Sequence, residues 1–269
     1  MLFRSCGMWV VSQISGVISH HYMFRGYADK AVQVSLTNLA TLEKTNNISM
    51  MTSYFGCLYS QSVICGGIPE TPFYHNKWNE FYEKGKSVKF TAVNIPATQV
   101  LLALEHNETG AKVDEAIASF ESFKMLDYHH RFVQSLIPHL RVRQLDRAQD
   151  SDARKKIIRT LKRDLFKTFL LAPTPIHRCH YFIAKAGLCR NLGQHEKALQ
   201  FLRKAEKLAY YSDSVIGHYQ INLEKARIEK ARSNGNLVQM YAEAAIELAD
   251  KYGWKLRRTE AEKEFNIKH

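Results

Sequence analysis

The feature that most constrains the fold of this chain is a series of turn signals that divides roughly its last hundred residues into helix-length segments. Leu192-Gly193 and Asn234-Gly235 indicate helix ends, because glycine readily adopts the left-handed conformation that follows a helix C-terminus. Thr174 and Pro175 indicate a helix start, with a capping hydroxyl ahead of a proline in the first turn. The signals predict two antiparallel helical hairpins, with helices over residues 175–191, 194–210, 213–232 (capped by Ser212 or Asp213) and 237–252.

The turns recur at an interval that predicts a repeat over the whole chain. The step from Gly193 to Gly235, taken backwards from Gly193, reaches positions 151, 109, 67 and 25. Glycines occur at 110, 67 and 26, and Ser151-Asp152 is a helix N-cap pair at the remaining position. Each hairpin of a helical solenoid buries its apolar face only by stacking on its neighbours. We therefore expect an all-α solenoid of antiparallel hairpins with a period of about 42 residues.

Residues 174–210 resemble one tetratricopeptide repeat. Small residues stand where the two helices of such a repeat touch, and large ones fill the gaps, at Tyr181-Phe182, Ala186, Leu192-Gly193, Ala198-Leu199, Leu202 and Ala205. Residues 22–31, which read Tyr-Met-Phe-Arg-Gly-Tyr-Ala-Asp-Lys-Ala, resemble the G-Y-x-x-x-A turn in the repeats of large signalling ATPases. Residues 114–120 resemble a second helix of the same kind. Such repeats form the C-terminal tails of soluble adenylyl cyclases, so the resemblance implies a regulatory, non-catalytic role in cAMP signalling.

The chain departs from the tetratricopeptide pattern in two respects. Its period exceeds the usual length of about 34 residues, which leaves a HEAT-like repeat open. Residues 66–96 contain Gly66-Gly67 and three prolines and do not predict a regular pair of helices. We therefore divide the chain into N-terminal helical repeats (1–65), an irregular aromatic-rich insertion (66–96), helical repeats with a basic helix (97–172) and tetratricopeptide-like hairpins (173–269).

The insertion carries a cluster of aromatic residues. Trp78, Phe81 and Tyr82 share the face of a short helix, and we expect them to plug the side of the solenoid. If that face is exposed instead, it is a candidate interface, because aromatic anchors dominate protein interfaces.

Local patterns of catalytic, metal or cofactor sites do not occur in the sequence. It holds no G-x-S-x-G elbow, no H-E-x-x-H helix and no glycine-rich nucleotide fingerprint. His177, Cys179 and His180 suggest a metal site, but no further ligand follows at a suitable spacing, which favours a structural role. We expect no cofactor and no metal, and no catalysis by this chain alone.

Composition favours a reduced, cytoplasmic protein and leaves the kind of anionic partner open. The five cysteines form no C-x-x-C pair, and no apolar run approaches the ~20 residues that cross a bilayer. Lysine and arginine exceed aspartate and glutamate by 38 to 26, a net charge of +12. Such an excess favours an acidic protein, a nucleic acid or an anionic membrane surface as the partner.

Positive charge is most concentrated in a predicted basic helix over residues 141–167. Its apolar stripe (Ile157, Ile158, Leu161, Leu165, Phe166, Phe169 and Leu170) is expected to be buried, while the bases face water. The expected basic patch consists of Arg154, Lys155, Arg159, Lys162 and Arg163. A solvated amphipathic helix accounts for the pattern, and binding of nucleic acid or an anionic surface is the alternative function.

The repeat pattern favours recognition of a protein partner as the function. The first helix of each hairpin is expected to line a concave groove, with Cys179, Phe182, Ile183 and Ala186 in the core behind it. The residues predicted to face the partner are Arg178, Lys185, Arg190, Gln220, Arg227 and Lys230. Two alternatives remain: a fragment of a soluble adenylyl cyclase whose catalytic domains lie elsewhere, and a binder of nucleic acid or anionic surfaces whose affinity falls steeply with salt.

Overall fold

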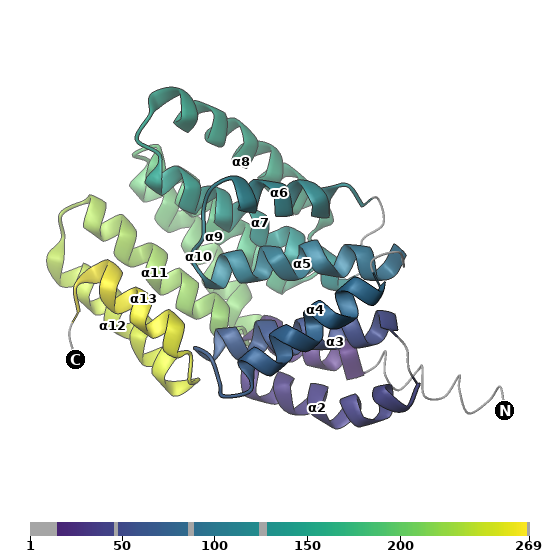
Figure 1. The fold of residues 1–269 in the computed structure, drawn as a ribbon. Coiled ribbons are helices and arrows are strands. Elements are labelled where there is room, and N and C mark those ends of the chain that lie inside the picture. Colours follow the sequence, from purple (N-terminus) through teal and green to yellow (C-terminus); the bar gives the residue numbers. More distant parts are fainter. Residues whose placement is uncertain (1–14, 46–47, 86–88, 124–127, 268–269) are drawn as a thin grey trace.

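The computed structural model describes residues 15–45, 48–85, 89–123 and 128–267. These residues are mostly helical and contain no strand, which confirms the all-α class. A helical segment at residues 15–25 precedes the labelled helices in Figure 1. The labelled helices are α2 (Ala28–Thr45), α3 (Ile48–Ile64), α4 (Thr71–Gly85), α5 (Lys89–Glu105), α6 (Ala111–Glu121), α7 (Tyr128–Arg147), α8 (Ser151–Leu171), α9 (Pro175–Asn191), α10 (His195–Tyr211), α11 (Val215–Ala231), α12 (Gly235–Lys251) and α13 (Lys255–Phe265).

The helices from α9 onward begin at evenly spaced positions, at 175, 195, 215, 235 and 255. Each turn between them has one residue with positive φ, at Gly193, Asp213, Ser233 and Gly253. The N–H of the following residue donates to a carbonyl five residues earlier, over 2.8 to 3.0 Å, which is the Schellman arrangement. The period predicted from Gly193 and Gly235 is not confirmed, because Ser233 makes this turn while Gly235 already belongs to α12.

The start of α11 differs from the predicted cap. The residue that caps this helix is Ser214, whose Oγ accepts a hydrogen bond of 3.1 Å from the N–H of Gly217. Asp213, one of the two predicted caps, has a φ of 48° and belongs to the preceding turn. The start of α9 agrees with the sequence: Thr174 is at the N-cap position and Pro175 begins the helix.

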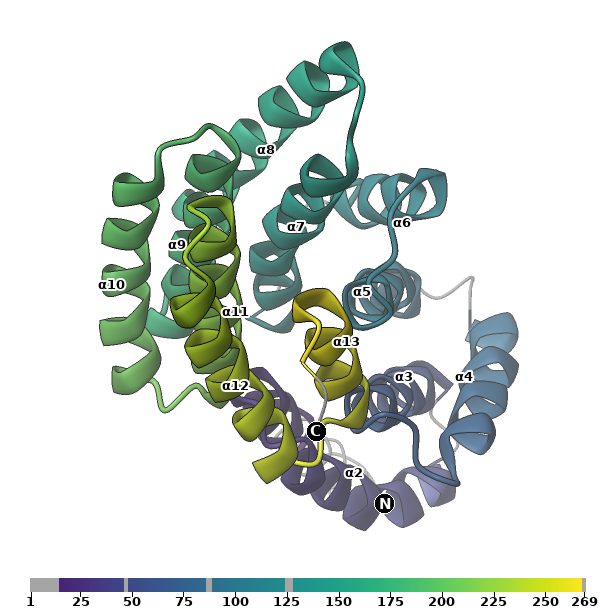
Figure 2. The ribbon, with the colours of Figure 1, turned by 90° about the vertical axis from the view of Figure 1, so that its left-hand side faces the viewer.

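The helices form a ring with two layers. The inner layer consists of α3, α5, α7, α9 and α11, which contact one another in turn, and the even-numbered helices pack outside it. Figure 2 looks along the opening of this ring and shows α13 inside it. An open solenoid is therefore not confirmed. None of the helices in the described residues combines the length and the apolar character needed to cross a membrane.

The ring closes where the turn at Gly26 meets the turn at Trp254. Gly26 has a φ of 98°, and a Cβ placed on it would lie only 2.7 Å from Cζ2 of Trp254. Trp254 is fully buried, and the rings of Tyr27 and Tyr252 are 5.8 Å apart beside it. One apolar cluster accordingly joins Met23, Phe24, Ala28 and Ala31 to Val215, Ala249, Trp254 and Ala261. The first and last described helices thus share a core.

Helix α13, which lies inside the ring, is not among the helices predicted from the sequence. The prediction ends at residue 252, because residues 255–265 lack an apolar stripe. Only Arg257 and Ala261 of this helix are buried, and charged side chains occupy most other positions. Hydrophobic periodicity carries no signal for such a helix.

The predicted basic helix over residues 141–167 is wrong: the segment forms a hairpin. Helix α7 ends at Arg147 and α8 begins at Ser151. Asp150 caps α8, because its Oδ2 accepts a hydrogen bond of 2.7 Å from the N–H of Ala153. The predicted break near residue 151 therefore occurs, and it divides the basic residues between two helices.

The apolar stripe predicted for α8 is buried only in part. Leu161 and Leu165 are buried against α7 and α9. The other end of the stripe is exposed, with exposed fractions of 63% for Phe166, 52% for Phe169 and 65% for Leu170. The reason is that α8 is an outer helix, and its neighbours α7 and α9 cover only one side of it.

Residues 66–96 are more regular than predicted. Helix α4 occupies 71–85, with Pro72 in its first turn, where proline is tolerated, and Pro96 lies inside α5. Tyr74 and Trp78 are buried against α3, while Phe81 and Tyr82 pack at the edge of the same cluster. The aromatic side chains therefore mostly pack inward, as the plug hypothesis predicts, although Phe73 is 51% exposed. The domain boundaries remain predictions.

The closure predicts different costs for two glycine-to-alanine variants. Gly26→Ala forces a Cβ into the Trp254 ring at positive φ, and we expect a loss of about 2–4 kcal/mol of unfolding free energy. Gly193→Ala has a similar φ of 72° but open space around the Cβ, so only backbone strain of about 1–2 kcal/mol is expected. Urea unfolding of both variants measures the difference, and equal losses would contradict the close packing at Gly26.

Candidate functional site

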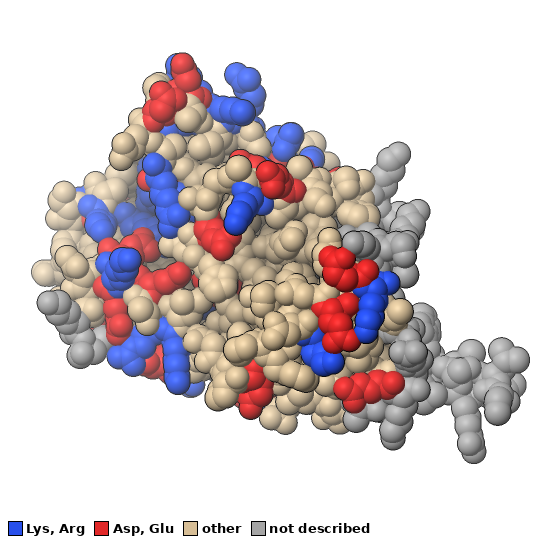
Figure 3. Space-filling model, in the orientation of Figure 1, with Lys and Arg blue, Asp and Glu red and all other residues tan. Residues whose placement is uncertain are grey.

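A cavity of about 570 Å³ lies in the centre of the ring. Its walls come from α5, α7, α9 and α11, and α13 provides the remaining side. Most of the lining side chains are polar or charged, in contrast to the apolar core around Trp254. In Figure 3, basic and acidic side chains alternate over the part of the surface that α11 and α13 occupy in Figure 1.

Ion pairs occupy one wall of this cavity. Arg190 pairs with Glu224 at 2.7 Å and with Asp146 at 2.9 Å. Arg227 holds both carboxylate oxygens of Glu264 on α13, over 2.6 and 2.7 Å. Glu224 is 3% exposed, and a carboxylate buried to that degree needs charged or hydrogen-bonding partners. The network therefore joins α7, α9, α11 and α13.

A second ion pair anchors α13 to a distant part of the chain. Arg257 and Glu105 are 5% and 6% exposed, and both oxygens of the carboxylate accept hydrogen bonds from the guanidinium. The guanidinium also lies 4.9 Å from the ring centre of Trp254, and the hydroxyl of Tyr219 donates to the backbone carbonyl of Arg257 over 2.9 Å. These contacts place α13 against α5 and α11.

A strip of aromatic rings that does not line the cavity crosses α8, α9 and α10. Ring centres are 5.5 Å apart for Phe169 and Tyr181, 5.1 Å for Tyr181 and Phe182, and 6.0 Å for Phe182 and Phe201. The exposed side chains of Phe166 and Leu170 extend this strip along α8. Contiguous exposed apolar side chains are candidates for a binding surface.

Cations surround these rings. The Nζ of Lys185 lies 4.8 Å from the ring centre of Phe201, and the Nζ of Lys204 lies 5.7 Å from that of Phe182. Arg178 is exposed one turn before Tyr181 and donates to the carbonyl of Ala172, and Lys162 is exposed one turn before Phe166. Within the described part of the chain, none of these four cations pairs with a carboxylate. We call this surface the cationic-aromatic face; it comprises Lys162, Phe166, Phe169, Leu170, Arg178, Tyr181, Phe182, Lys185, Phe201 and Lys204.

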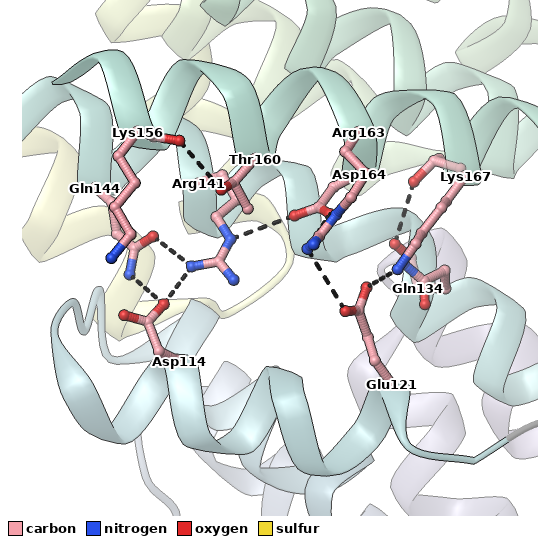
Figure 4. A network of polar contacts seen from close by, with 11 residues as sticks. Asp114, Glu121, Gln134, Arg141, Gln144, Lys156, Thr160, Arg163, Asp164 and Lys167 are labelled. Carbon is pink, nitrogen blue, oxygen red and sulfur yellow. Dashed lines mark hydrogen bonds and ion pairs between the residues drawn. The ribbon is translucent and has the colours of Figure 1, made fainter. Parts of the chain in front are cut away.

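The polar contacts in Figure 4 hold α8, which carries part of this face, against α6 and α7. Asp164 of α8 is fully buried and accepts a hydrogen bond of 3.3 Å from Nε of Arg141, which also pairs with Asp114. Lys167 pairs with Glu121 of α6 at 2.9 Å. The charged groups on the side of α8 that faces α6 and α7 are therefore paired, whereas Arg159 and Lys162 of the same helix are exposed.

The six residues predicted to face a protein partner lie on both sides of the ring. Arg178 and Lys185 belong to the cationic-aromatic face. Arg190, Arg227 and Gln220 lie at or beside the cavity, and Gln220 bonds His180 at 3.2 Å. Lys230 donates to the backbone carbonyl of Glu264 over 3.0 Å. The sequence predicted an empty groove at these inner positions, where the polar helix α13 lies instead.

The predicted basic patch is also divided. Arg154 bonds the carbonyls of Leu145 and Ala148, at the turn between α7 and α8, and Lys155 pairs with Asp152. Arg163 pairs with Asp164 at 3.1 Å. Arg159 and Lys162 are exposed and have no carboxylate partner among the described residues.

The three candidate metal ligands of α9 are buried. His177, Cys179 and His180 are fully buried on α9, and the described residues hold no group of three or more side chains suited to a metal ion. Sγ of Cys57 lies 2.8 Å from Nε2 of His20, a pair that the sequence does not reveal. Burial raises the pKa of Cys57 to about 12, opposite to the shift that an activated thiol requires.

The burial of His180 predicts a pH dependence of stability. Burial lowers its pKa to about 3, with His177 adding to the effect, whereas an unfolded histidine titrates near 6.5. Its contribution to stability is therefore fully present above pH 6.5 and is lost as the pH falls toward 3. We expect His180→Gln to reduce the pH slope of the unfolding free energy over that range by up to about 1.4 kcal/mol per pH unit.

Urea unfolding at pH 7.5 and pH 5 measures this slope. His106→Gln is the matched control, because His106 is exposed. A slope in His180→Gln equal to that of the unsubstituted protein would contradict the burial of a neutral His180.

No family model matches this chain, and comparisons with curated proteins and with solved structures find no similar protein.

Proposed function

We propose that this chain is a non-catalytic protein-interaction scaffold, built of tetratricopeptide-like hairpins, that binds an acidic, amphipathic segment of a partner protein on the cationic-aromatic face. The observation that carries the proposal is the set of four cations without carboxylate partners, among the described residues, around a continuous strip of rings. Recognition by a rigid helical surface needs no catalytic group and no cofactor from this chain.

The repeat character of the hairpins supports a scaffold. Helices of equal spacing, joined by identical Schellman turns, present side chains from successive helices at fixed positions. Cys179, Ile183 and Ala186 are buried between α9, α10 and α11, as expected for the core of a tetratricopeptide hairpin, and Phe182 is half-buried. The resemblance to the repeat tails of soluble adenylyl cyclases stays a prediction.

Charge complementarity and the exposed apolar groups favour an acidic, amphipathic partner. Carboxylates of the partner would pair with Arg178, Lys185 and Lys204, which have no such partner within the described part of the chain. Apolar side chains of the partner would pack on Phe166 and Leu170, which are more than 60% exposed. Aromatic and arginine side chains at the centre of an interface contribute most of its binding energy.

Nucleic acid fits this face less well. Bases bind single-stranded sites by stacking on free aromatic faces. Tyr181 is only 7% exposed, and Phe182 and Phe201 stack on each other beneath lysine side chains. The rings therefore offer edges and apolar surface more than free faces for stacking.

A fluorescent synthetic peptide tests the proposal. It should form an amphipathic helix with leucines on one side and glutamates on the other. We expect the triple variant Arg178→Glu, Lys185→Glu and Lys204→Glu to bind it at least 10-fold more weakly, because each lost charge pair at an interface costs about 1 kcal/mol or more. The control variant Lys112→Glu, Lys251→Glu and Lys255→Glu makes the same change in net charge at other exposed lysines and should leave binding unchanged.

Competing ligands and salt separate the alternatives. Measurable peptide binding at high salt is expected, because part of the interface is apolar. If both triple variants weaken peptide binding equally, net charge alone explains the loss, and the proposed face is contradicted. Preferential binding of a single-stranded RNA or of phosphatidylserine vesicles, with a steep loss of affinity in salt, would instead support the alternative function.

A further inference from the structure

The wall of the central cavity that α7 provides carries a row of one histidine and two arginine side chains. His139, Arg143 and Arg147 are spaced four residues apart and therefore share one face of the helix. Nε2 of His139 has no hydrogen-bond partner within the described residues. Arg143 donates to the backbone carbonyl of Leu104, and Arg147 donates to the hydroxyl of Thr109 over 3.0 Å. In the same part of the chain, no carboxylate pairs with any of the three.

The acidic side chains of the cavity are, by contrast, nearly all paired. Glu105, Asp146, Glu224 and Glu264 each contact an arginine. Only Glu260 has neither a hydrogen bond nor an ion pair within the part of the chain that the structure describes, although its charge and that of Arg143 attract each other at longer range. Arg143, Arg147 and Lys263 form no ion pair there either. The lining therefore has more unpaired positive than negative groups.

Burial makes the positive charges of Arg143 and Arg257 costly. Burial lowers the pKa of Arg143 below the ordinary value for arginine, and the neighbouring Arg227 lowers it further, while the carboxylates of Glu260 and Glu105 offset part of the shift. Arg257 is 5% exposed, and its Nη1 has no hydrogen-bond partner among the described residues. Buried donors without acceptors cost free energy, and an anion with several oxygens would satisfy them.

We propose that the central cavity binds a small organic oxyanion, held by Arg143 and Arg147 of α7 and by Arg257 of α13. The volume of about 570 Å³ lies within the range of small-molecule sites, which is about 300–1,000 Å³. A carboxylate or a phosphate group fits the planar donors of arginine equally well, so the shared chemistry is an oxyanion on an organic molecule. This site is distinct from the cationic-aromatic face, and its existence does not depend on the proposed scaffold function.

Isothermal titration calorimetry on the full chain tests the site with sodium succinate and, separately, with inorganic phosphate. Sodium chloride at equal ionic strength and neutral succinamide are the reference titrations. We expect saturable binding of at least one of the two anions, and an affinity at least 10-fold lower in the double variant Arg143→Gln and Arg147→Gln. Arg147→Gln alone should weaken binding too, and it keeps the test valid if the double variant does not fold, because Arg147 is exposed.

Substitution of Glu260 should change the affinity for the anion in the opposite direction. Glu260→Gln removes a negative charge from the cavity, so we expect tighter binding, whereas Glu247→Gln on the outer helix α12 should have no effect. Succinate binding without phosphate binding would assign the site to carboxylates, and the reverse would assign it to phosphates. Absence of saturable binding for both anions, or equal affinity in the arginine variants, would overturn the proposal.

Discussion

The contact between α13 and the rest of the ring is the interaction on which the structure depends. Trp254 fills the space above Gly26, and Arg257 pairs with Glu105, a residue 152 positions earlier in the chain. Helix α13 has little apolar surface of its own, so these contacts and the pair between Arg227 and Glu264 hold it in place. They bring the first and last described helices together and turn a row of hairpins into a ring.

The closure gives the two sides of the ring different electrostatics. Inside, carboxylates and guanidinium groups are mostly paired, and a few donors remain around a polar cavity. Away from the cavity, Asp164 pairs with Arg141 and Glu121 pairs with Lys167. Lys162, Arg178, Lys185 and Lys204 remain without acidic partners among the described residues. A polar cavity of this size suits a small ligand, whereas an exposed apolar and cationic surface suits a macromolecular partner.

The sequence predicts the parts of this fold that local physics determines. Thr174, Pro175 and Gly193 indicate the bounds of α9, and the apolar stripe of α10 indicates its buried side, because caps and periodicity act within a few residues. The exposure of Phe166 and Phe169 could not be predicted, since it depends on which neighbours α8 receives. Helix α13 could not be predicted, because it is held by charged residues that are distant in the sequence. The cavity could not be predicted either, because α13 forms one of its sides. Two of the six predicted contact residues, Arg178 and Lys185, lie on the proposed face.

A distance measurement between spin labels at positions 30 and 251 tests the closure of the ring most directly. Lys30 and Lys251 are exposed and lie over the rings of Tyr27 and Tyr252, whose centres are only 5.8 Å apart. Labels on cysteines introduced there, with the native cysteines replaced, should give one narrow distribution at short distance by double electron–electron resonance. A broad distribution at long distance, as in an open stack of hairpins whose two ends do not meet, would contradict the account.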